Sequence, residues 1–286
     1  TITNTDNLYI GVLNSNGTPA NYLDGKISSF KIFNSALTLA QIQEMYLNPE
    51  QILPTGVASS NLKLWLPLQE GSGTTNYDGS GNNNHGTITG ATWVKAETDI
   101  AQTALIRSNY TSSVFYPEGL TAGQDIQGTT LANTDENVLT LNGAEYVEVP
   151  DSDTLDFGDG SSDSPFSIEA WIKMDEATKF RIASKCGFDS NMGWAFTING
   201  SDKLSLYLYD ADTVKNINKI GDVAIVAGQW YHVVSTYDGS GSNSGILLYV
   251  DGSLHASTGG TAGSYTAMHD TTAGVDIGRL RYVVST

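Results

Sequence analysis

Hydrophobic and polar positions alternate along much of the chain with a period of two residues. In residues 166–173, Phe-Ser-Ile-Glu-Ala-Trp-Ile-Lys, every second side chain is apolar, and residues 193–198 and 204–209 repeat the pattern. Successive side chains of a strand point to opposite faces, so this period predicts strands with one buried face. Asp-Gly turns follow at residues 238–239 and 251–252. The pattern predicts an all-β fold, a two-sheet antiparallel sandwich or jelly roll.

One segment departs from this period and predicts a single short helix. Thr38 and Gln41 have the spacing of a capping box, Ile42 and Met45 follow at helical spacing, and Pro49 ends the run. We expect this helix to lie across the rim of a sheet.

Composition and charge indicate which partners the chain can bind and in which compartment it works. Lys and Arg total 14 against 31 for Asp and Glu, a formal net charge of −17. That charge repels phosphate backbones and anionic lipid, so we expect no nucleic-acid partner. No apolar run approaches the roughly 20 residues of a membrane span, so we expect no membrane insertion. Only 16% of residues are charged and 30 are Gly, which favours an extracellular or virion-surface protein over an acidic cytosolic domain. The single cysteine, Cys186, is expected to be a small buried side chain.

Several segments follow one another in a characteristic order. They are Leu-Trp-Leu-Pro-Leu-Gln-Glu-Gly from residue 64, Tyr-Asp-Gly-Ser-Gly-Asn-Asn-Asn-His-Gly from residue 77, Leu-Thr-Leu-Asn-Gly-Ala from residue 139, the alternating segment 166–173, and Gly-Gln-Trp-Tyr-His-Val-Val from residue 228. In this order they resemble the laminin-G-like, concanavalin A-like lectin and glucanase family. The resemblance covers about residues 7–48, 62–94 and 138–280. It implies a concanavalin A-like jelly roll.

The order of the segments is circularly shifted relative to that family. Its closing turn, strand and short helix resemble residues 24–38 here, ahead of the rest of the domain. The resemblance therefore divides the chain into closing strands and helix (1–50), a linker (51–61), the first strands (62–94), an irregular insertion (95–137) and the main body (138–286). Residues 1–50 complete either their own chain's sheet, which we favour, or that of an identical neighbour in a head-to-tail assembly.

Residues 78–86, Asp-Gly-Ser-Gly-Asn-Asn-Asn-His-Gly, form a candidate structural calcium loop with Asp78, Asn82 and Asn84 as ligands. Carboxylate, amide and carbonyl oxygens are the ligands that calcium prefers, and the matching loop of the resembled family sometimes holds calcium. The alternative is an Asx-rich turn that satisfies its own backbone. A second acidic segment, with five aspartates between residues 151 and 163, either gathers a cation or is a solvated loop.

Sugar binding needs an aromatic platform with amides and carboxylates beside it. Alternation in residues 204–209 places leucines inward and two tyrosines outward. The candidate carbohydrate-binding residues are Trp194, Tyr207, Tyr209, Asp210 and Asp212, with Trp171 as another stacking surface.

No catalytic motif was found. The chain lacks the Glu-x-Asp-x-x-Glu strand of glucanases with this fold, and it has no Gly-x-Ser-x-Gly or His-Glu-x-x-His pattern. We expect a non-catalytic module of an extracellular or virion appendage that binds a glycan or another cell-surface ligand. The alternative is a purely structural phage, fibre or surface-layer subunit that assembles by strand exchange without binding sugar.

Overall fold

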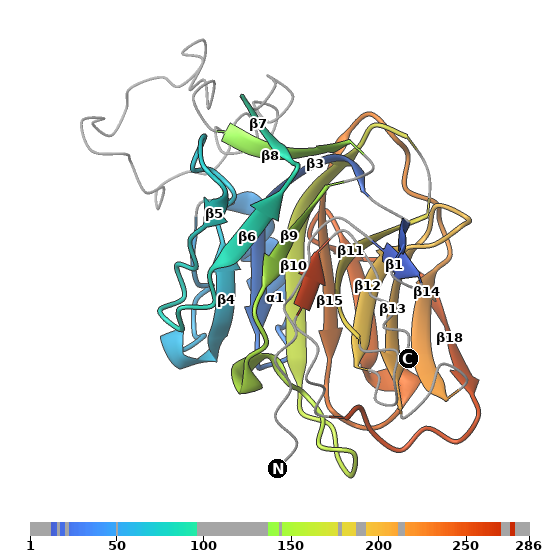
Figure 1. The fold of residues 1–286 in the computed structure, drawn as a ribbon. Helices are drawn as coiled ribbons and strands as arrows, with labels where there is room; N and C mark the ends of the chain where they lie inside the picture. Colours follow the sequence, from blue (N-terminus) through green and yellow to red (C-terminus); the bar gives the residue numbers. More distant parts are fainter. Residues whose placement is uncertain are drawn as a thin grey trace, which may run out of the picture.

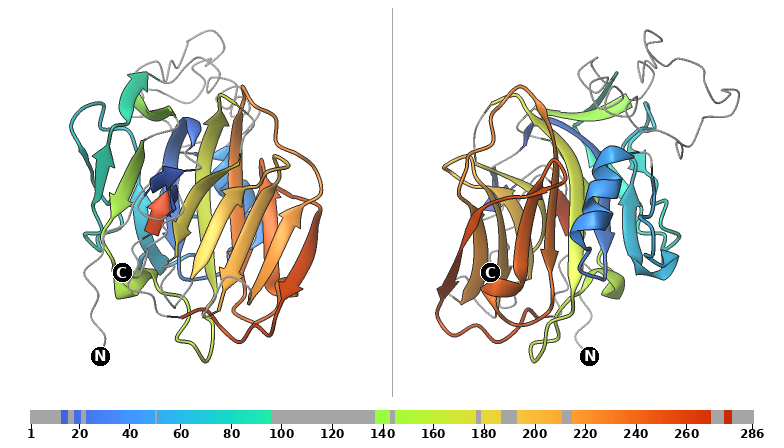
Figure 2. Two further views of the ribbon diagram at one scale, coloured as in Figure 1. Left: turned by 45° about the vertical axis from the view of Figure 1, so that its right-hand side comes forward. Right: turned by 180° about the vertical axis from the view of Figure 1, so that it is seen from behind.

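The structure is a computed structural model. It describes residues 13–15, 18–20, 23–49, 51–95, 137–142, 145–176, 179–186, 193–210, 215–269 and 275–277. Within these ranges the fold is all-β with one α-helix, and two antiparallel sheets pack face to face as a sandwich (Figures 1 and 2). No helix in the described part of the chain is both long and apolar enough to cross a membrane.

The two sheets differ in strand number. The eight-stranded sheet has the order β17 (Ser253–Leu254), β16 (Ile246–Val250), β15 (Trp230–Tyr237), β10 (Phe166–Met174), β3 (Asp24–Phe33), β8 (Asn137–Asn142) and β7 (Thr92–Lys95), with β4 (Leu62–Leu66) also paired to β3. The nine-stranded sheet has the order β18 (Ser257–Ala262), β14 (Asn216–Gly221), β13 (Leu204–Tyr209), β12 (Trp194–Ile198), β11 (Phe180–Lys185), β19 (Val275–Ile277), β9 (Tyr146–Val149), β6 (Gly86–Thr89) and β5 (Thr75–Asn76). A separate hairpin joins β1 (Leu13–Ser15) to β2 (Thr18–Ala20).

The main core lies between the sheets and is built from the predicted inward positions. On β10 these are Phe166, Ile168, Ala170 and Ile172, and on β13 they are the three leucines Leu204, Leu206 and Leu208. All are fully buried. The alternation in the sequence therefore identified the inward face of both strands correctly.

Strand β3 closes the eight-stranded sheet of its own chain. It pairs with β10 on one side and with β8 and β4 on the other. Its side chains Ile27, Phe30 and Ile32 are fully buried in the main core. The sheet that contains β16 thus receives its central strand from the N-terminal segment, and Figure 1 shows β3 beside β10.

Helix α1 (Leu39–Leu47) begins at Thr38, which caps it with the predicted capping box: the Thr38 side chain accepts from the Gln41 backbone and the Gln41 side chain from the Thr38 backbone. The prediction that α1 lies across a rim was wrong. Its buried residues Ile42 and Met45 pack on the outer face of the eight-stranded sheet, in a second apolar cluster with Val234 and Tyr249. Figure 2, seen from behind, shows the helix against this face.

Candidate functional site

Two tyrosines of β13 form an aromatic platform on the outer face of the nine-stranded sheet. Since Leu206 and Leu208 point into the core, Tyr207 and Tyr209 point away from it, and both are half-buried. Their rings stack with centroids 5.8 Å apart and planes inclined by 9°. The two rings form an apolar patch on the outer face, and the exposed part of an aromatic ring is the kind of surface that packs against the C–H face of a sugar.

Polar groups flank this platform on the adjacent strand. The register of β13 and β14 places Asn218 opposite Tyr207 and Asn216 opposite Tyr209. Asn218 Nδ2 donates to Asn216 Oδ1 over 3.0 Å, which aligns the two amides. Amides supply both donors and acceptors; Asn216 is 8% exposed, so the half-buried Asn218 is the amide that offers hydrogen-bonding groups beside the rings.

A cation lies on the other side of the platform. Arg181 of β11 is 6% exposed, and its Nε has no hydrogen-bond partner among the described residues. Burial raises the pKa of Tyr207, and the nearby Arg181 guanidinium opposes that shift. Because this Nε is buried, Arg181 contributes positive charge beside the rings rather than an accessible hydrogen-bond donor. In Figure 1 the β1–β2 hairpin lies in front of β12 and β13, on this same side of the molecule.

Two other predicted sugar ligands do not belong to this surface. Trp194 is 1% exposed and lies in the main core, because its register opposite Leu208 gives it the inward face of β12. Trp171 is on the other sheet, 7% exposed, and stacks with Tyr46 of α1 at 5.9 Å. Neither indole offers an open platform, so their assignment as stacking surfaces was wrong.

The acidic candidates beside the platform have a different position or use. Asp210 is 6% exposed; its Oδ2 accepts from the Thr266 backbone N–H over 3.0 Å and its Oδ1 lies 3.1 Å from His269 Nε2. Asp210 therefore fastens the segment after β18 to the end of β13. Asp212 lies outside the described residues, so of the five predicted ligands Tyr207 and Tyr209 form the observed platform.

Comparison with known proteins agrees with this architecture. The family model of the concanavalin A-like lectin/glucanases superfamily, of the laminin-G type, matches residues 141–282. Residues 141–282 belong to this superfamily. The matched part of the laminin-G-type domain includes the Tyr207–Tyr209 platform, whereas β3, α1 and β4 to β7 lie outside the match but in the same sandwich. No curated protein matches the chain.

The candidate calcium loop, residues 78–86, which lies outside the matched residues, is an Asx turn in this geometry. Asp78 Oδ1 accepts from the backbone N–H groups of Trp65 and Ser80, at 3.0 and 2.8 Å. Its Oδ2 accepts from Ser80 Oγ and from the Asn84 backbone, at 2.8 and 3.0 Å. A carboxylate has about four lone-pair sites, so Asp78 is fully used by the loop and by the neighbouring strand β4.

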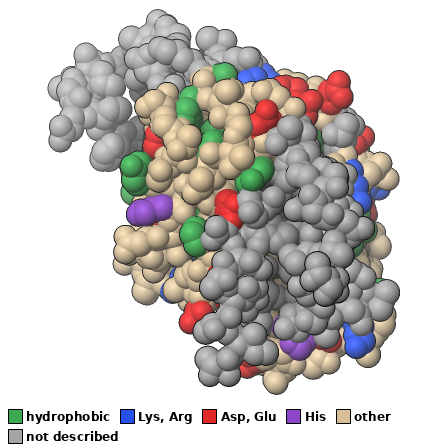
Figure 3. All heavy atoms as spheres, viewed as in Figure 1, with side chains coloured by type: hydrophobic (Ala, Val, Ile, Leu, Met, Phe, Trp, Pro, Cys, Tyr) green, Lys and Arg blue, Asp and Glu red, His purple; other side chains and the backbone are tan. Residues whose placement is uncertain are grey.

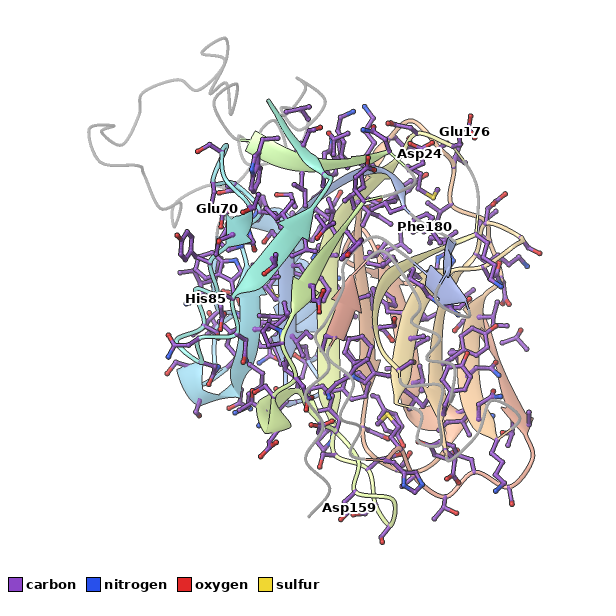
Figure 4. The ribbon with its side chains drawn as sticks, in the orientation of Figure 1. Asp24, Glu70, His85, Asp159, Glu176 and Phe180 are labelled. Carbon is purple, nitrogen blue, oxygen red and sulfur yellow. The ribbon has the colours of Figure 1, made fainter. Side chains whose placement is uncertain are left out.

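The amides of the loop also serve the protein backbone. Asn82 Nδ2 donates to the carbonyls of Leu62 and Lys63, and Asn84 Nδ2 donates to the Lys63 carbonyl. The His85 ring accepts from the Asp78 backbone N–H at 3.0 Å, and Figure 4 shows His85 beside β6. In the part of the chain that the structure describes, no group of three His, Cys, Asp or Glu side chains is arranged to hold a metal. The contacts of Asp78, Asn82 and Asn84 do not fit a calcium site, and calcium binding stays a prediction.

Melting experiments separate the two interpretations of this loop. We expect Asp78→Ala to lower the free energy of unfolding by about 2–3 kcal/mol, because it leaves buried N–H donors without their acceptor. The loss should be the same in calcium and in chelator. Asp153→Ala, at an exposed aspartate, is the control and should change stability by less than about 0.5 kcal/mol. A calcium-dependent gain in melting temperature that Asp78→Ala abolishes would restore the metal site.

The acidic segment 151–163 does not form one cluster. Asp151 and Asp156 both pair with the buried ammonium of Lys185, at 2.7 and 2.9 Å. Asp163 accepts from the hydroxyls of Tyr237 and Tyr265. Asp159 caps its own turn through Ser161 and Ser162 and lies near the tip of the loop in Figure 4. The aspartates are thus divided among separate structural contacts.

Sequence reasoning did not bring together three buried groups of the sandwich. Lys31, Glu169 and His232 lie on the outer face of the eight-stranded sheet under α1, with fully buried side chains. Charged residues at outward strand positions indicate a solvent-exposed face, so alternation alone misleads here. The signal that identifies them is the apolar side of the capped helix, which needs a sheet face to cover.

Proposed function

We propose that the chain is a non-catalytic glycan-binding module of an extracellular or virion-borne appendage. The observation that supports it is the stacked Tyr207–Tyr209 platform, flanked by aligned amides and by Arg181. Membership of a lectin and glucanase superfamily agrees with carbohydrate binding in general. Since fold does not determine function, the proposal rests on the chemistry of this one surface.

The non-catalytic part of the proposal rests on the sequence. Glycoside hydrolysis uses two carboxylates about 5–10 Å apart across the bond that breaks. The chain has no Glu-x-Asp-x-x-Glu strand to place them. Of the carboxylates near the platform, Asp210 is engaged by Thr266 and His269.

The surface of the module fits an environment in which hydroxyl and amide groups supply solubility. Figure 3 shows the described surface on one side of the molecule as mainly backbone and uncharged polar side chains, with acidic groups scattered among them. This composition agrees with the proposed extracellular or virion location.

Binding measurements on one tyrosine test the proposal. Purified chain is screened on a glycan array, and the best ligand is titrated against Tyr207→Ala. We expect about a tenfold weaker affinity, the equivalent of about 1.4 kcal/mol, because the stacked surface is halved. Tyr77→Ala, at a tyrosine 61% exposed and outside the platform, should bind like the parent. Equal losses in both variants, or a folded parent that binds no glycan, would contradict the proposal.

A second candidate function is a structural subunit that assembles head to tail by strand exchange. Its structural basis is that the central strand β3, paired here within its own chain, is joined to β4 through α1 and residues 48–61, so the same segment could reach a neighbouring chain. The chain would then form oligomers at physiological concentration and bind no sugar. Native mass spectrometry of the parent chain distinguishes the two functions.

A further inference from the structure

A buried charged cluster lies where β3 meets the rest of the sheet. Lys31 Nζ is 2.9 Å from Glu169 Oε2 and 3.3 Å from Oε1, and His232 Nε2 is 3.1 Å from Glu169 Oε1. The three side chains come from adjacent strands and are 0% exposed. The ring of Tyr46 on α1 covers His232 at a centroid distance of 5.8 Å.

Glu169 is a fully buried carboxylate that depends on its cation. Burial alone would raise the pKa of Glu169, but Lys31 and His232 outweigh burial and hold that pKa below its ordinary value. The nearest strong cation is Lys31, 138 residues away in sequence. Removing one member of such a pair leaves an uncompensated buried charge, which is strongly destabilising. The face formed by β10 and β15 is therefore complete only when a strand brings a cation to Glu169.

The cluster also selects one register. Lys31 lies directly opposite Glu169, and Trp171 lies opposite His232. A slip of one residue would turn the Lys31 ammonium into the main core and turn Ile32 away from it. A docking strand is thus recognised by the position of its lysine as well as by its apolar side chains.

The segment that docks here is a strand followed by a helix. Ile27 and Ile32 of β3 fill the main core, while Ile42 and Met45 of α1 fill the second apolar cluster over Val234 and Tyr249. Residues 48–61 join this segment to β4. An element docked through its own contacts and joined by a short linker is the kind that identical chains exchange.

We propose that the edge of β10, together with the outer face of β10 and β15, is a docking site for a strand–helix segment with a cation opposite Glu169, and that it accepts the β3–α1 segment of a second copy of this chain when its own segment does not match. The proposal does not depend on glycan binding. Its partner is defined by charge complementarity at Lys31 and Glu169 and by the helix that covers them.

Two variants of the whole chain test whether Glu169 selects a docking strand that carries a cation. Lys31→Met and Glu169→Gln each leave one buried charge without its partner, so each chain alone should melt about 10 °C below the parent. In an exchanged heterodimer of the two, Glu169 of one chain meets Lys31 of the other, and the remaining site is neutral. Refolding an equimolar mixture should give a heterodimer in native mass spectrometry that melts above either variant alone. Both changes in one chain should give a monomer.

A second ion pair on the same strand is the control for this experiment. Lys26 lies on the same strand and is 3.9 Å from Asp175, whose side chain is 43% exposed. The mixture of Lys26→Met with Asp175→Asn should stay monomeric. A variant that fails to fold alone but is rescued in the mixture supports the proposal. Mixtures that contain monomers only, or that stay unfolded, would overturn it, as would single variants that melt with the parent.

Discussion

Replacing Gly25 by alanine is expected to cost roughly 3–5 kcal/mol of unfolding free energy. Gly25 has a φ of +153°, which L side chains rarely adopt, and an added Cβ would lie 2.0 Å from the Lys173 carbonyl oxygen. The residue pairs with Met174 on β10 and with Leu141 on β8, so neither neighbour moves without breaking a ladder. The strand that closes the eight-stranded sheet should therefore detach at its start. Urea unfolding followed by circular dichroism measures the loss.

A glycine without these constraints is the control. Gly200, in the turn between β12 and β13, has nothing within 4 Å of an added Cβ. Gly200→Ala should change the unfolding free energy by less than about 0.5 kcal/mol. If Gly25→Ala unfolded at the same urea concentration as Gly200→Ala, the result would contradict the close contact between Gly25 of β3 and the Lys173 carbonyl of β10. Exposed strand edges in the Gly25 variant should also appear as aggregation in light scattering.

Much of the fold follows from local patterns in the sequence. A period of two identified the inward faces of β10 and β13, and the Thr38–Gln41 capping box identified the start of α1. Both signals act within a few residues, so they are visible without the fold. The packing of α1 is not local: its apolar side had to cover a sheet face, and that face includes strands more than 100 residues away.

The difference between local and non-local signals also explains which residues of the candidate site were predicted correctly. Tyr207 and Tyr209 share one strand, so alternation placed them together on the outer face. Their polar neighbours come from β14 and β11, whose register with β13 and β12 is set by the whole sheet. Asp78 has the composition of a calcium ligand, but its carboxylate is used by Trp65 of a strand outside the loop. Composition names the available groups, whereas tertiary pairing decides which of them are free.

The two faces of the β12–β13 hairpin should respond differently to substitution. Trp194 is 1% exposed in the main core, and its ring lies 6.1 Å from that of Phe166. Trp194→Ala leaves a cavity that the surrounding side chains fill only in part. We therefore expect a loss of about 3–5 kcal/mol in unfolding free energy. Its affinity for glycan, measured on the folded fraction at low temperature, should equal that of the parent because the indole does not reach the outer face.

Tyr207→Ala is the matched variant on the opposite face of this hairpin. It should lower stability by about 1 kcal/mol, since the ring is half-buried, while its affinity for glycan falls about tenfold. Thermal unfolding and isothermal titration give the stability and the glycan affinity of both variants. We expect a crossed pattern, in which Trp194→Ala loses mainly stability and Tyr207→Ala loses mainly affinity. A Trp194→Ala chain that stays as stable as the parent but loses binding would place the indole on the ligand surface and reverse the assignment of the two faces. The crossed result would assign stability to the inward face of β12 and recognition to the outward face of β13.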